Sequence, residues 1–541
     1  MPQFVTTITP GEIERYRADG SWSDKIITDY LADAVAATPG KVAVIDSRGS
    51  TTYRELAQKV ERCAHGLIAL GIGPEDAVAI QLPNWVEFMV LHLALTRIGA
   101  ITTLITPINR DREIVHMLNI SEAKLLVIAR EFRGYDYPAL ARRVAPRMKT
   151  LVVGEADADM LSWDAFMNTA WESGHAAAEL DKLRPSADAV TEIVFTSGAT
   201  GEPKGVLHTN NTIIAPQRQM ARSLGLTPDD VVHIASTVAH QTGFLNGIRL
   251  PIQAGATVVM QDVWRPEDFI DLIERHRINF SNGSATFLLD MLRAKNLAQR
   301  DVSSFKIFRC GGGPIPRALV VEAREKISHV TILRGWGQSE NGVVTLTRIS
   351  DAEEKLTETD GCAQPGMQVR IASADARPLP PGKEGKLQCH GPFQFAGYAK
   401  QETLTRESYI DGWFDTGDLA TIDADGYIRI TGRAKDIIIR GGENIPVKFV
   451  EDVLYENANV QDAAIVGMPD ERLGERACAY VICRPGKAFN MAAMQAFLGE
   501  KGVAKQWWPE RLEIADELPR TANGKIRKAD LRARLAKTAK P

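Results

Sequence analysis

A repeated alternation of amphipathic helical patterns with short apolar runs dominates the first half of this chain and limits the folds open to it. Residues 53–70 carry apolar side chains at helical spacing, and apolar or β-branched runs follow at 77–82, 100–104 and 125–128. A polar, proline-containing connector at 181–189 separates this series from a second one. The second series has its apolar runs at 192–196, 231–235 and 256–260. Such alternation is typical of parallel strands joined by helical crossovers, so we expect two α/β units of similar size, side by side.

The pattern changes after Gly382. Short strands punctuated by glycine and aspartate are expected at 385–389, 413–415, 419–422 and 427–431. From about Lys435, a helical pattern at 447–457 precedes strand patterns at 463–467 and 477–482, and a basic helix at 529–537 closes the chain. The expected fold class is therefore α/β. Residues 1–434 would form two α/β subdomains and a small β-rich one, and residues 435–541 would form a separate α+β domain.

Length and charge exclude several classes of protein. A chain of 541 residues is longer than one compact core usually requires, which favours two to four domains. Lys and Arg number 64 and Asp and Glu number 68, so the net charge is −4 and no overall basic field attracts nucleic acid. Hydrophobic residues make up 44% and charged residues 24%, as in an ordinary globular protein.

Cysteine usage and the apolar stretches bear on the compartment. The six cysteines include no C-x-x-C pair and are too few for a disulfide scaffold, which favours a reducing environment. Residues 1–15 lack the basic start and apolar core of a signal peptide, and the most apolar stretch, 88–108, contains His92 and Arg97. We therefore expect a cytoplasmic protein without a membrane span.

A run of small and hydroxyl residues after the strand pattern at 192–196 has the composition of a phosphate-binding loop. It consists of Thr196, Ser197, Gly198, Ala199, Thr200, Gly201, Glu202, Pro203, Lys204 and Gly205. Glycines let backbone N–H groups converge on an anion, hydroxyls donate hydrogen bonds and the lysine adds charge. Pro203 and Gly205 flank the lysine where a Walker A motif has glycine and Ser or Thr, which disfavours a P-loop kinase or GTPase. Taken alone, a solvated loop explains this composition equally well.

Four further segments make the chain similar to a known superfamily. Residues 335–340 read Gly-Trp-Gly-Gln-Ser-Glu, 411–418 read Asp-Gly-Trp-Phe-Asp-Thr-Gly-Asp, 432–436 read Gly-Arg-Ala-Lys-Asp and 519–526 read Pro-Arg-Thr-Ala-Asn-Gly-Lys-Ile. Together with the run at 196–205, they resemble the motifs of the adenylate-forming enzymes, which include acyl-CoA synthetases, peptide-synthetase adenylation domains and luciferases. The resemblance implies a large N-terminal region of three subdomains and a mobile C-terminal lid.

The resemblance implies a set of residues that join a carboxylate to the α-phosphate of ATP and release pyrophosphate. Residues 196–204 would wrap the β- and γ-phosphates, Glu340 and Thr196 would hold Mg²⁺, and Lys525 would reach the reacting carboxylate and α-phosphate from the lid. These groups would meet the negative charge that the transition state concentrates.

Other residues are implied to bind the nucleoside. The carboxylate of Asp418 suits two ribose hydroxyls, Arg433 would lie beside the same sugar and a phosphate, and Trp336 would offer a flat face to adenine. The remaining nucleotide contacts implied by the resemblance are Gly312, Gly313, Pro314, Gly337, Gln338 and Ser339. Serine replaces the family's commoner threonine at position 339 and keeps its hydroxyl.

A hinge implied at Lys435 leads us to expect two lid positions. In one position Lys525 would catalyse adenylation, and in the other the loop with Gly441 and Gly442 would help to form a tunnel for the pantetheine of CoA. The expected ligands are a small carboxylic acid, ATP, Mg²⁺ and CoA. A homodimer is left open. Exposure of Lys525 in an open lid would also make it a target for a lysine acetyltransferase, which would remove the charge needed for adenylation.

The start of the acyl pocket bears on the class of acid. Residues 236–244 contain no carboxylate, so the ammonium group of an amino acid would lack a buried partner. The pocket candidates are His240, Phe244, Ser284, Gly311, Gly313 and Val343. Since most of them are small or apolar, a compact hydrophobic acid is expected. His240 is expected beside the acyl carboxylate as a catalytic or gating residue, with a packed, hydrogen-bonded histidine as the alternative.

Local runs distinguish the branches of the superfamily. Those at 240–244 and 440–446 most resemble bacterial medium-chain fatty acid and cyclohexanecarboxylate CoA ligases, which predicts an AMP-forming acid:CoA ligase for such an acid. The alternative is an aryl-acid AMP ligase that loads a 2,3-dihydroxybenzoate-like acid onto a carrier protein. The N-terminal Tyr16, Arg17 and Trp22 favour this alternative, and Gln241, where hydroxybenzoate enzymes tend to have asparagine, weakens it.

A third interpretation is a catalytically silent homologue that only binds nucleotide. The intact Lys525, Glu340 and Asp418 disfavour it, because a silent protein has no need of all three groups.

Overall fold

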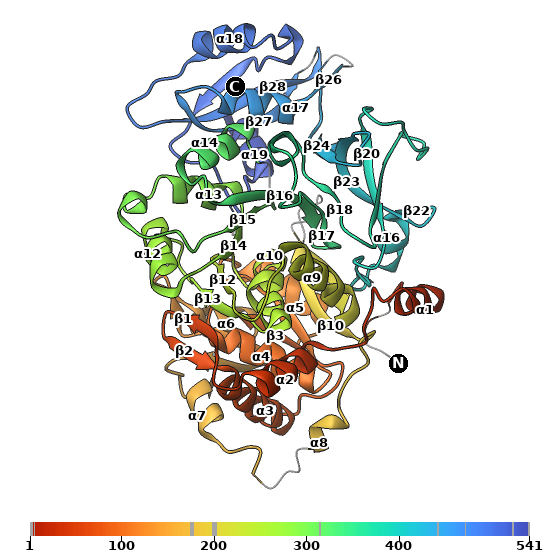
Figure 1. The fold of residues 1–541 in the computed structure, drawn as a ribbon, viewed down its shortest axis with the longest axis vertical. Coiled ribbons are helices and arrows are strands. Elements are labelled where there is room, and N and C mark those ends of the chain that lie inside the picture. Colours follow the sequence, from red (N-terminus) through yellow and green to blue (C-terminus); the bar gives the residue numbers. More distant parts are fainter. Residues whose placement is uncertain are drawn as a thin grey trace.

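The structure is a computed structural model that describes residue 4 and residues 6–173, 178–196, 203–312, 315–440, 443–470, 472–521 and 524–538. Two large sheets with surrounding helices form the body of the molecule (Figure 1). A β-rich unit and the C-terminal unit lie beyond one end of this body, at the upper part of the view. The α/β fold class expected from the sequence is confirmed.

An eight-stranded sheet contains most of the first strand series. Its order is β21 (Gly397–Tyr398), β11 (Lys204–Thr209), β10 (Val190–Thr196), β4 (Ile101–Leu104), β3 (Ala77–Gln81), β5 (Leu125–Ala129), β8 (Lys149–Val153) and β9 (Leu161–Ser162). All neighbours from β10 to β9 are parallel, whereas β11 is antiparallel to β10 and β21. The helices packed on these strands are α4 (Val86–Arg97), α5 (Asp111–Ser121), α6 (Tyr137–Val144) and α7 (Trp163–Asn168).

A nine-stranded sheet forms the other half of the body. Its order is β18 (Cys362–Ala363), β17 (Gly342–Leu346), β16 (Thr331–Gln338), β15 (Ile307–Cys310), β14 (Phe280–Gly283), β12 (Val231–Ile234), β13 (Thr257–Met260), β1 (Val42–Asp46) and β2 (Gly49–Thr52). Helices α12 (Pro266–His276), α13 (Ala285–Leu292) and α14 (Arg317–Lys326) cover one face and share a hydrophobic cluster with it. Further helices of the body are α2 (Ile27–Ala37), α3 (Tyr53–Ala69), α9 (Asn210–Leu224), α10 (Gln241–Phe244), η1 (Leu245–Arg249) and α11 (Leu250–Ala254).

The two sheets exchange strands, which differs from the two consecutive units expected. Strand β1, from the first series, pairs with β13 of the second sheet, and β10, from the second series, pairs with β4 of the first. One hydrophobic cluster accordingly contains residues of both sheets. Alternating patterns indicate that a strand exists but not its partner, because the partner is selected by burial over long sequence separations.

The β-rich unit contains one strand where the sequence predicted two. Its sheet has the order β19 (Gln368–Ala372), β20 (Gly385–His390), β23 (Trp413–Ile422) and β22 (Tyr409–Ile410), with β24 (Ile428–Arg433) also paired to β23. The expectation of separate strands at 413–415 and 419–422 is wrong, since β23 is continuous through Gly417. The register of β23 against β20 shifts around this glycine, which has a φ of 71°, and the strand continues past it.

The C-terminal unit has hydrophobic clusters of its own. Strands β27 (Val460–Asp470) and β28 (Gly474–Cys483) pair with each other, and β25 (Ile438–Arg440), β26 (Glu443–Ile445) and β29 (Arg511–Ile514) complete the sheet. The helices are α17 (Val447–Tyr455), α18 (Met491–Glu500) and α19 (Lys528–Thr538). Two clusters pack entirely within residues 438–535. A separate core is what allows a unit to move as a body.

Three findings concern membrane crossing, the apolar stretch and the cysteines. None of the helices in the described part of the chain combines the length and the apolar character that a membrane crossing needs. The apolar stretch at 88–108 contains most of α4 and all of β4. His92, on α4, is buried and hydrogen-bonded to Thr102 on β4. All six cysteines are free thiols, as expected.

Candidate active site

A cleft of about 890 Å³ separates the C-terminal unit from the body. From the body, it is lined by the segments that follow β14 and β15, which include parts of α13 and α14, and by the second half of β16. From the β-rich unit it receives β23 and β24, and from the C-terminal unit the segment that carries Lys525. Four of the five sequence motifs therefore contribute residues to one cavity.

Asp418 is the centre of a hydrogen-bonded cluster in this cleft. The indole Nε1 of Trp336 and the amide Nε2 of Gln338 donate to its Oδ2, at 2.8 Å and 3.2 Å. The guanidinium Nε of Arg433 lies 2.9 Å from Oδ1, because β23 and β24 place these two residues opposite each other. The carboxylate is buried and held by three donors, yet it keeps lone pairs that can accept from ligand hydroxyls.

A tight turn between β16 and β17 positions Glu340. A Cβ atom on Gly337 would lie 1.7 Å from the carbonyl oxygen of Gly342, so this close approach of the two strands requires glycine. The backbone oxygen of Glu340 accepts from the N–H of Phe395 at 2.7 Å, and that of Ser339 is 2.7 Å from Nε2 of His208. These contacts fix the backbone on both sides of the glutamate.

The glutamate lies beside the end of the loop expected to bind phosphate. The phenol of Tyr398 donates to Oε1 of Glu340 at 2.9 Å, and Nζ of Lys204 lies 5.1 Å from the centroid of the Tyr398 ring. Thr196 is the register partner of Lys204 across β10 and β11. Burial and the glutamate raise the pKa of Tyr398, so the phenol stays protonated and donates. The second oxygen of Glu340 is not used by this bond and can bind a hard cation.

Lys525 reaches the opposite wall of the cleft. The position that a Cβ would take on Gly312 is 3.9 Å from Cε of Lys525 and 3.9 Å from Oγ1 of Thr242. The lysine therefore approaches the segment that follows His240. Its charge contributes to the lowered pKa of this histidine. A lysine carried by the C-terminal unit thus lies against residues of the body.

His240 is neutral and has a defined tautomer. Burial, followed by the charge of Lys525, lowers its pKa to about 3. Its Nδ1 accepts a hydrogen bond from the N–H of Thr242 at 3.4 Å, at the start of α10. The proton of the neutral ring is therefore on Nε2, where it can be donated to an oxygen of a ligand.

The acyl-pocket candidates occupy different environments. Ser284 lines the cleft, and its Oγ is buried without a hydrogen-bond partner. Gly311 donates its N–H to the oxygen of Gly283 at 3.0 Å. Val343 is buried on β17. Phe244 is fully buried in the core and contacts His92 edge-on at 4.6 Å between ring centroids.

Several predicted residues lie outside the described residues. They are Ser197, Gly198, Ala199, Thr200 and Gly201 of the phosphate loop, Gly313 and Pro314, and the glycine pair Gly441 and Gly442. The side chain of Lys435 is also outside them, and its backbone forms part of the short helix η3 (Ala434–Asp436). Their predicted roles stay predictions.

Sequence reasoning missed contacts that the structure places at the site. Tyr398 belongs to none of the motifs and reaches Glu340 from β21. Arg520 precedes Lys525 by five residues, and its guanidinium contacts Asp462, Thr286 and the oxygen of Gly524. Arg309, on β15, was also missed. A charged residue inside an otherwise apolar strand was a signal that could have found it.

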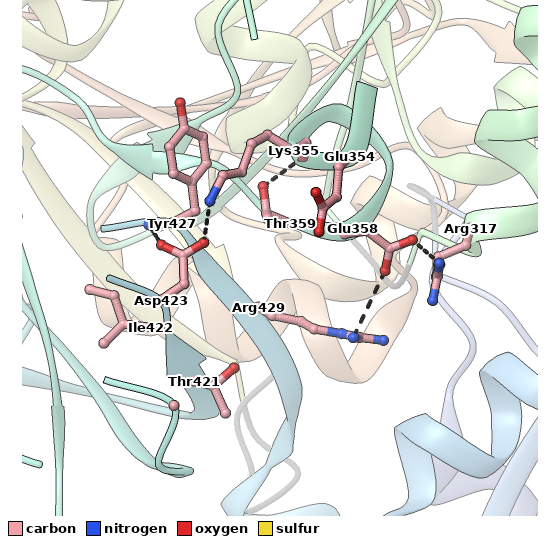
Figure 2. A pocket seen from close by; sticks show the side chains of 11 residues that line it. Arg317, Glu354, Lys355, Glu358, Thr359, Thr421, Ile422, Asp423, Tyr427 and Arg429 are labelled. Atoms are coloured by element: carbon pink, nitrogen blue, oxygen red, sulfur yellow. Dashed lines mark hydrogen bonds and ion pairs between the residues drawn. The ribbon is translucent and has the colours of Figure 1, made fainter. Parts of the chain in front are cut away.

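A second cavity, of about 520 Å³, lies away from the motifs (Figure 2). Most of its charges are paired: Lys355 contacts Asp423 at 2.6 Å, and Arg317 and Arg429 both face Glu358. Among the described residues, no group of three or more His, Cys, Asp or Glu side chains is placed to hold a metal by itself. A cation at Glu340 would therefore need oxygens from its ligand, as Mg²⁺ bound to ATP has.

Comparison with known proteins identifies the family of the chain. The family model described as "AMP-binding enzyme" matches residues 31–399, and that described as "AMP-binding enzyme C-terminal domain" matches residues 450–525. The chain belongs to the AMP-binding enzymes. This protein is therefore an adenylate-forming acid ligase, and the cleft that gathers its motifs is the candidate active site.

Relatives of this AMP-binding enzyme include both CoA ligases and AMP ligases. It is 35% identical to the medium-chain fatty-acid–CoA ligase of Escherichia coli K12, over 97% of this chain and 94% of the relative. It is 32% identical to the 2,3-dihydroxybenzoate-AMP ligase of Bacillus subtilis 168, over 97% of each chain. ATP-bound MatB from Rhodopseudomonas palustris superposes with a TM-score of 0.84 and 26% identity, over 95% of this chain and 100% of the other.

Proposed function

We propose that the protein is an ATP-dependent carboxylic acid:CoA ligase. It joins the acid to the α-phosphate of ATP, releases pyrophosphate, and then transfers the acyl group from AMP to the thiol of CoA, releasing AMP. The observation that carries the adenylation step is the reach of Lys525 across the cleft to Gly312, beside His240. A cation there stabilises the negative charge that develops between carboxylate and phosphate.

The other groups of the cleft suit the remaining parts of ATP. Asp418, oriented by three donors, would accept from the ribose hydroxyls. The indole of Trp336 lines the same cavity and would contact adenine. Thr196, Lys204 and the free oxygen of Glu340 fit a Mg²⁺–triphosphate, since they combine a hydroxyl, a cation and a hard carboxylate. Bound there, Mg²⁺ would neutralise phosphate charge.

For the acid, we propose a medium-chain fatty or alicyclic skeleton. The absence of a carboxylate from residues 236–244 argues against amino acids. The Escherichia coli relative is named for medium-chain fatty acids, which supports an alkyl acid and CoA as the acceptor. Four expectations stay predictions. They are the lid hinge at Lys435, the CoA contacts of Gly441 and Gly442, the homodimer and the acetylation of Lys525.

An aryl-acid AMP ligase acting with a carrier protein is the second candidate. One observation favours it: the Bacillus subtilis relative is named for 2,3-dihydroxybenzoate. Gln241, where hydroxybenzoate enzymes tend to have asparagine, weighs against it. The two candidates differ in the acceptor that follows adenylation.

Pyrophosphate release with and without CoA separates them. The assay uses ATP and Mg²⁺ with hexanoate, octanoate, cyclohexanecarboxylate, benzoate, 2,3-dihydroxybenzoate and several amino acids. We expect sustained, CoA-dependent turnover on alkyl or alicyclic acids. A single CoA-insensitive burst, strongest with the hydroxybenzoate, would instead support the carrier-protein enzyme, and omission of Mg²⁺ should abolish either reaction.

A further inference from the structure

A buried arginine without an ionic partner lies behind the wall of the cleft. Arg309, on β15, is only 4% exposed, and its Nη1 donates to Oδ1 of Asn282 at 2.9 Å. Its Nε is buried and has no acceptor. Among the described residues no carboxylate forms an ion pair with it. Burial lowers the pKa of the guanidinium to about 10, so the group is still a cation at neutral pH.

The neighbouring strand provides a comparison. Arg334, on β16, is equally buried, but its Nη2 pairs with Asp360 at 3.0 Å and also lies 3.4 Å from the oxygen of Ile315. Arg334 therefore has a carboxylate partner that Arg309 lacks, although its Nε is also without an acceptor. An unpaired buried cation is strongly unfavourable, so a group that supplies the missing acceptor is expected to bind at Arg309.

Glycines lie between the guanidinium and the cleft. A Cβ on Gly311 would lie 2.8 Å from Nη2 of Arg309, and one on Gly335 would lie 3.5 Å from it. Gly335 lines the cleft, and so does Gly312, which approaches Lys525. Arg309 and Lys525 therefore approach two consecutive glycines, Gly311 and Gly312.

The buried hydrogen-bonding groups that lack a partner at Arg309 are both donors. Besides Nε of the arginine, Nδ2 of Asn282 is buried and has no acceptor. The oxygen of the same amide already accepts from Arg309. A ligand that satisfies these groups must supply oxygen acceptors. A purely hydrocarbon end would leave a cation and an amide N–H desolvated and unpaired.

We infer that the acid activated in this cleft carries an oxygen acceptor at the end away from its reacting carboxylate, and that Arg309 and Asn282 bind this group. The inference rests on the proposed function and refines its substrate class. The acceptor is a second carboxylate or a ketone on a medium-length or alicyclic skeleton. Arg309 is then a residue that determines specificity.

Matched acids test the inference. The wild type is assayed for CoA-dependent pyrophosphate release with hexanoate, 5-oxohexanoate and adipate, and with cyclohexanecarboxylate and its 4-oxo and 4-carboxy derivatives. We expect kcat/KM for at least one acceptor-bearing acid to exceed that of its unsubstituted parent by about tenfold or more. Preference for the carboxy acids would identify an anionic group, and preference for the oxo acids a neutral one.

The variant Arg309→Met removes the charge and keeps the stem. It should lose about tenfold or more in kcat/KM on the preferred acid, with no loss on the unsubstituted parent, and Arg309→Lys should retain part of the preference. Preference of the wild type for the unsubstituted acids would overturn the inference, as would an equal loss on all acids in Arg309→Met. If that variant fails to fold, the wild-type panel decides alone. Failure of every acid would contradict the proposed ligase function instead.

Discussion

At the scale of single residues, the cleft depends on side chains that hold other side chains in place. Trp336 is an example: its ring lines the cavity, while its N–H is used on Asp418. The indole thus combines a flat surface with a donor. Arg433 and Gln338 complete the set of donors around this carboxylate, which explains why the residue expected to bind ribose is buried and ordered before any ligand arrives.

Replacing Trp336 by phenylalanine tests this double role. The ring is kept and the N–H to Asp418 is lost, so the KM for ATP should rise by about fivefold, equivalent to about 1 kcal/mol for one hydrogen bond, with a smaller effect on kcat. Trp413→Phe is the control, because Trp413 packs under Arg370 in the β-rich unit. ATP titrations of pyrophosphate release would measure both. An unchanged KM in Trp336→Phe would contradict the positioning role.

Lys525 should matter for one half-reaction only. In Lys525→Ala we expect adenylation to fall by about 10²- to 10³-fold, since the cation is needed where phosphate charge develops. Thioester formation from supplied acyl-AMP should be largely spared. Lys505→Ala, which changes an exposed lysine of the same unit, is the control. Equal loss in both half-reactions would contradict the assignment.

Titration of His240 should not affect the pH dependence of the reaction rate near neutrality. Its pKa is lowered to about 3, so the ring stays neutral above that value, and lowering the pH from 8 to 5.5 does not charge it. The ratio of wild-type to His240→Gln rates should therefore be constant over this range. An acidic limb near pH 6.5 that disappears in the variant would show that the ring titrates during the reaction.

At the scale of elements, one arginine links the lysine segment to both sides of the cleft. Arg520 contacts Asp462 on β27, the oxygen of Gly524, and Oγ1 of Thr286 on α13 at 3.3 Å. A Cβ on Gly524 would lie 3.0 Å from Oγ of Ser284, so the segment packs closely on the same helix start. The contacts of Arg520 therefore favour the position that the C-terminal unit has in this structure.

Removing this link should affect the adenylation step. In Arg520→Ala we expect adenylation to fall by about tenfold, with little change in thioester formation, because the lysine is retained but less well oriented. Arg520→Lys should recover part of the rate. Thr286→Val, which removes only the contact to the body, should have a smaller effect of the same kind. Stopped-flow measurement of each half-reaction would check this, and a matching loss in thioester formation would oppose it.

At the scale of the whole molecule, sequence patterns predicted elements better than their arrangement. Runs such as 77–82 and 125–128 became β3 and β5, because burial of a strand on both faces leaves a clear apolar signal. The exchange of β1 and β10 between the sheets had no such signal, since pairing depends on contacts over long separations. The motifs predicted Glu340 and Asp418. They did not predict Tyr398 or the unpaired Nε of Arg309, because these depend on contacts between segments far apart in the sequence.

The body contains several buried histidines, which makes its stability depend on pH. Burial lowers the pKa of His208 to about 4 and of His233 to about 3. Below about pH 6.5 the unfolded chain binds protons there that the folded chain does not, so stability falls as pH falls through this window. Buried Glu192, with its pKa raised to about 8, acts in the opposite direction between about pH 4.3 and 8. Because two buried histidines oppose one buried glutamate, we expect a net loss of stability as the pH falls below about 6.5.

His233→Gln isolates one of these protons. His233 lies within hydrogen-bonding distance of Ser281 and Gln261, at 2.9 Å and 3.2 Å, so the variant should be less stable than the wild type at pH 7.5. Because glutamine does not titrate, the gap in unfolding free energy should narrow by about 2 kcal/mol between pH 6.5 and 5.0. Urea unfolding followed by tryptophan fluorescence would measure it. A constant gap would mean that the folded protein binds this proton.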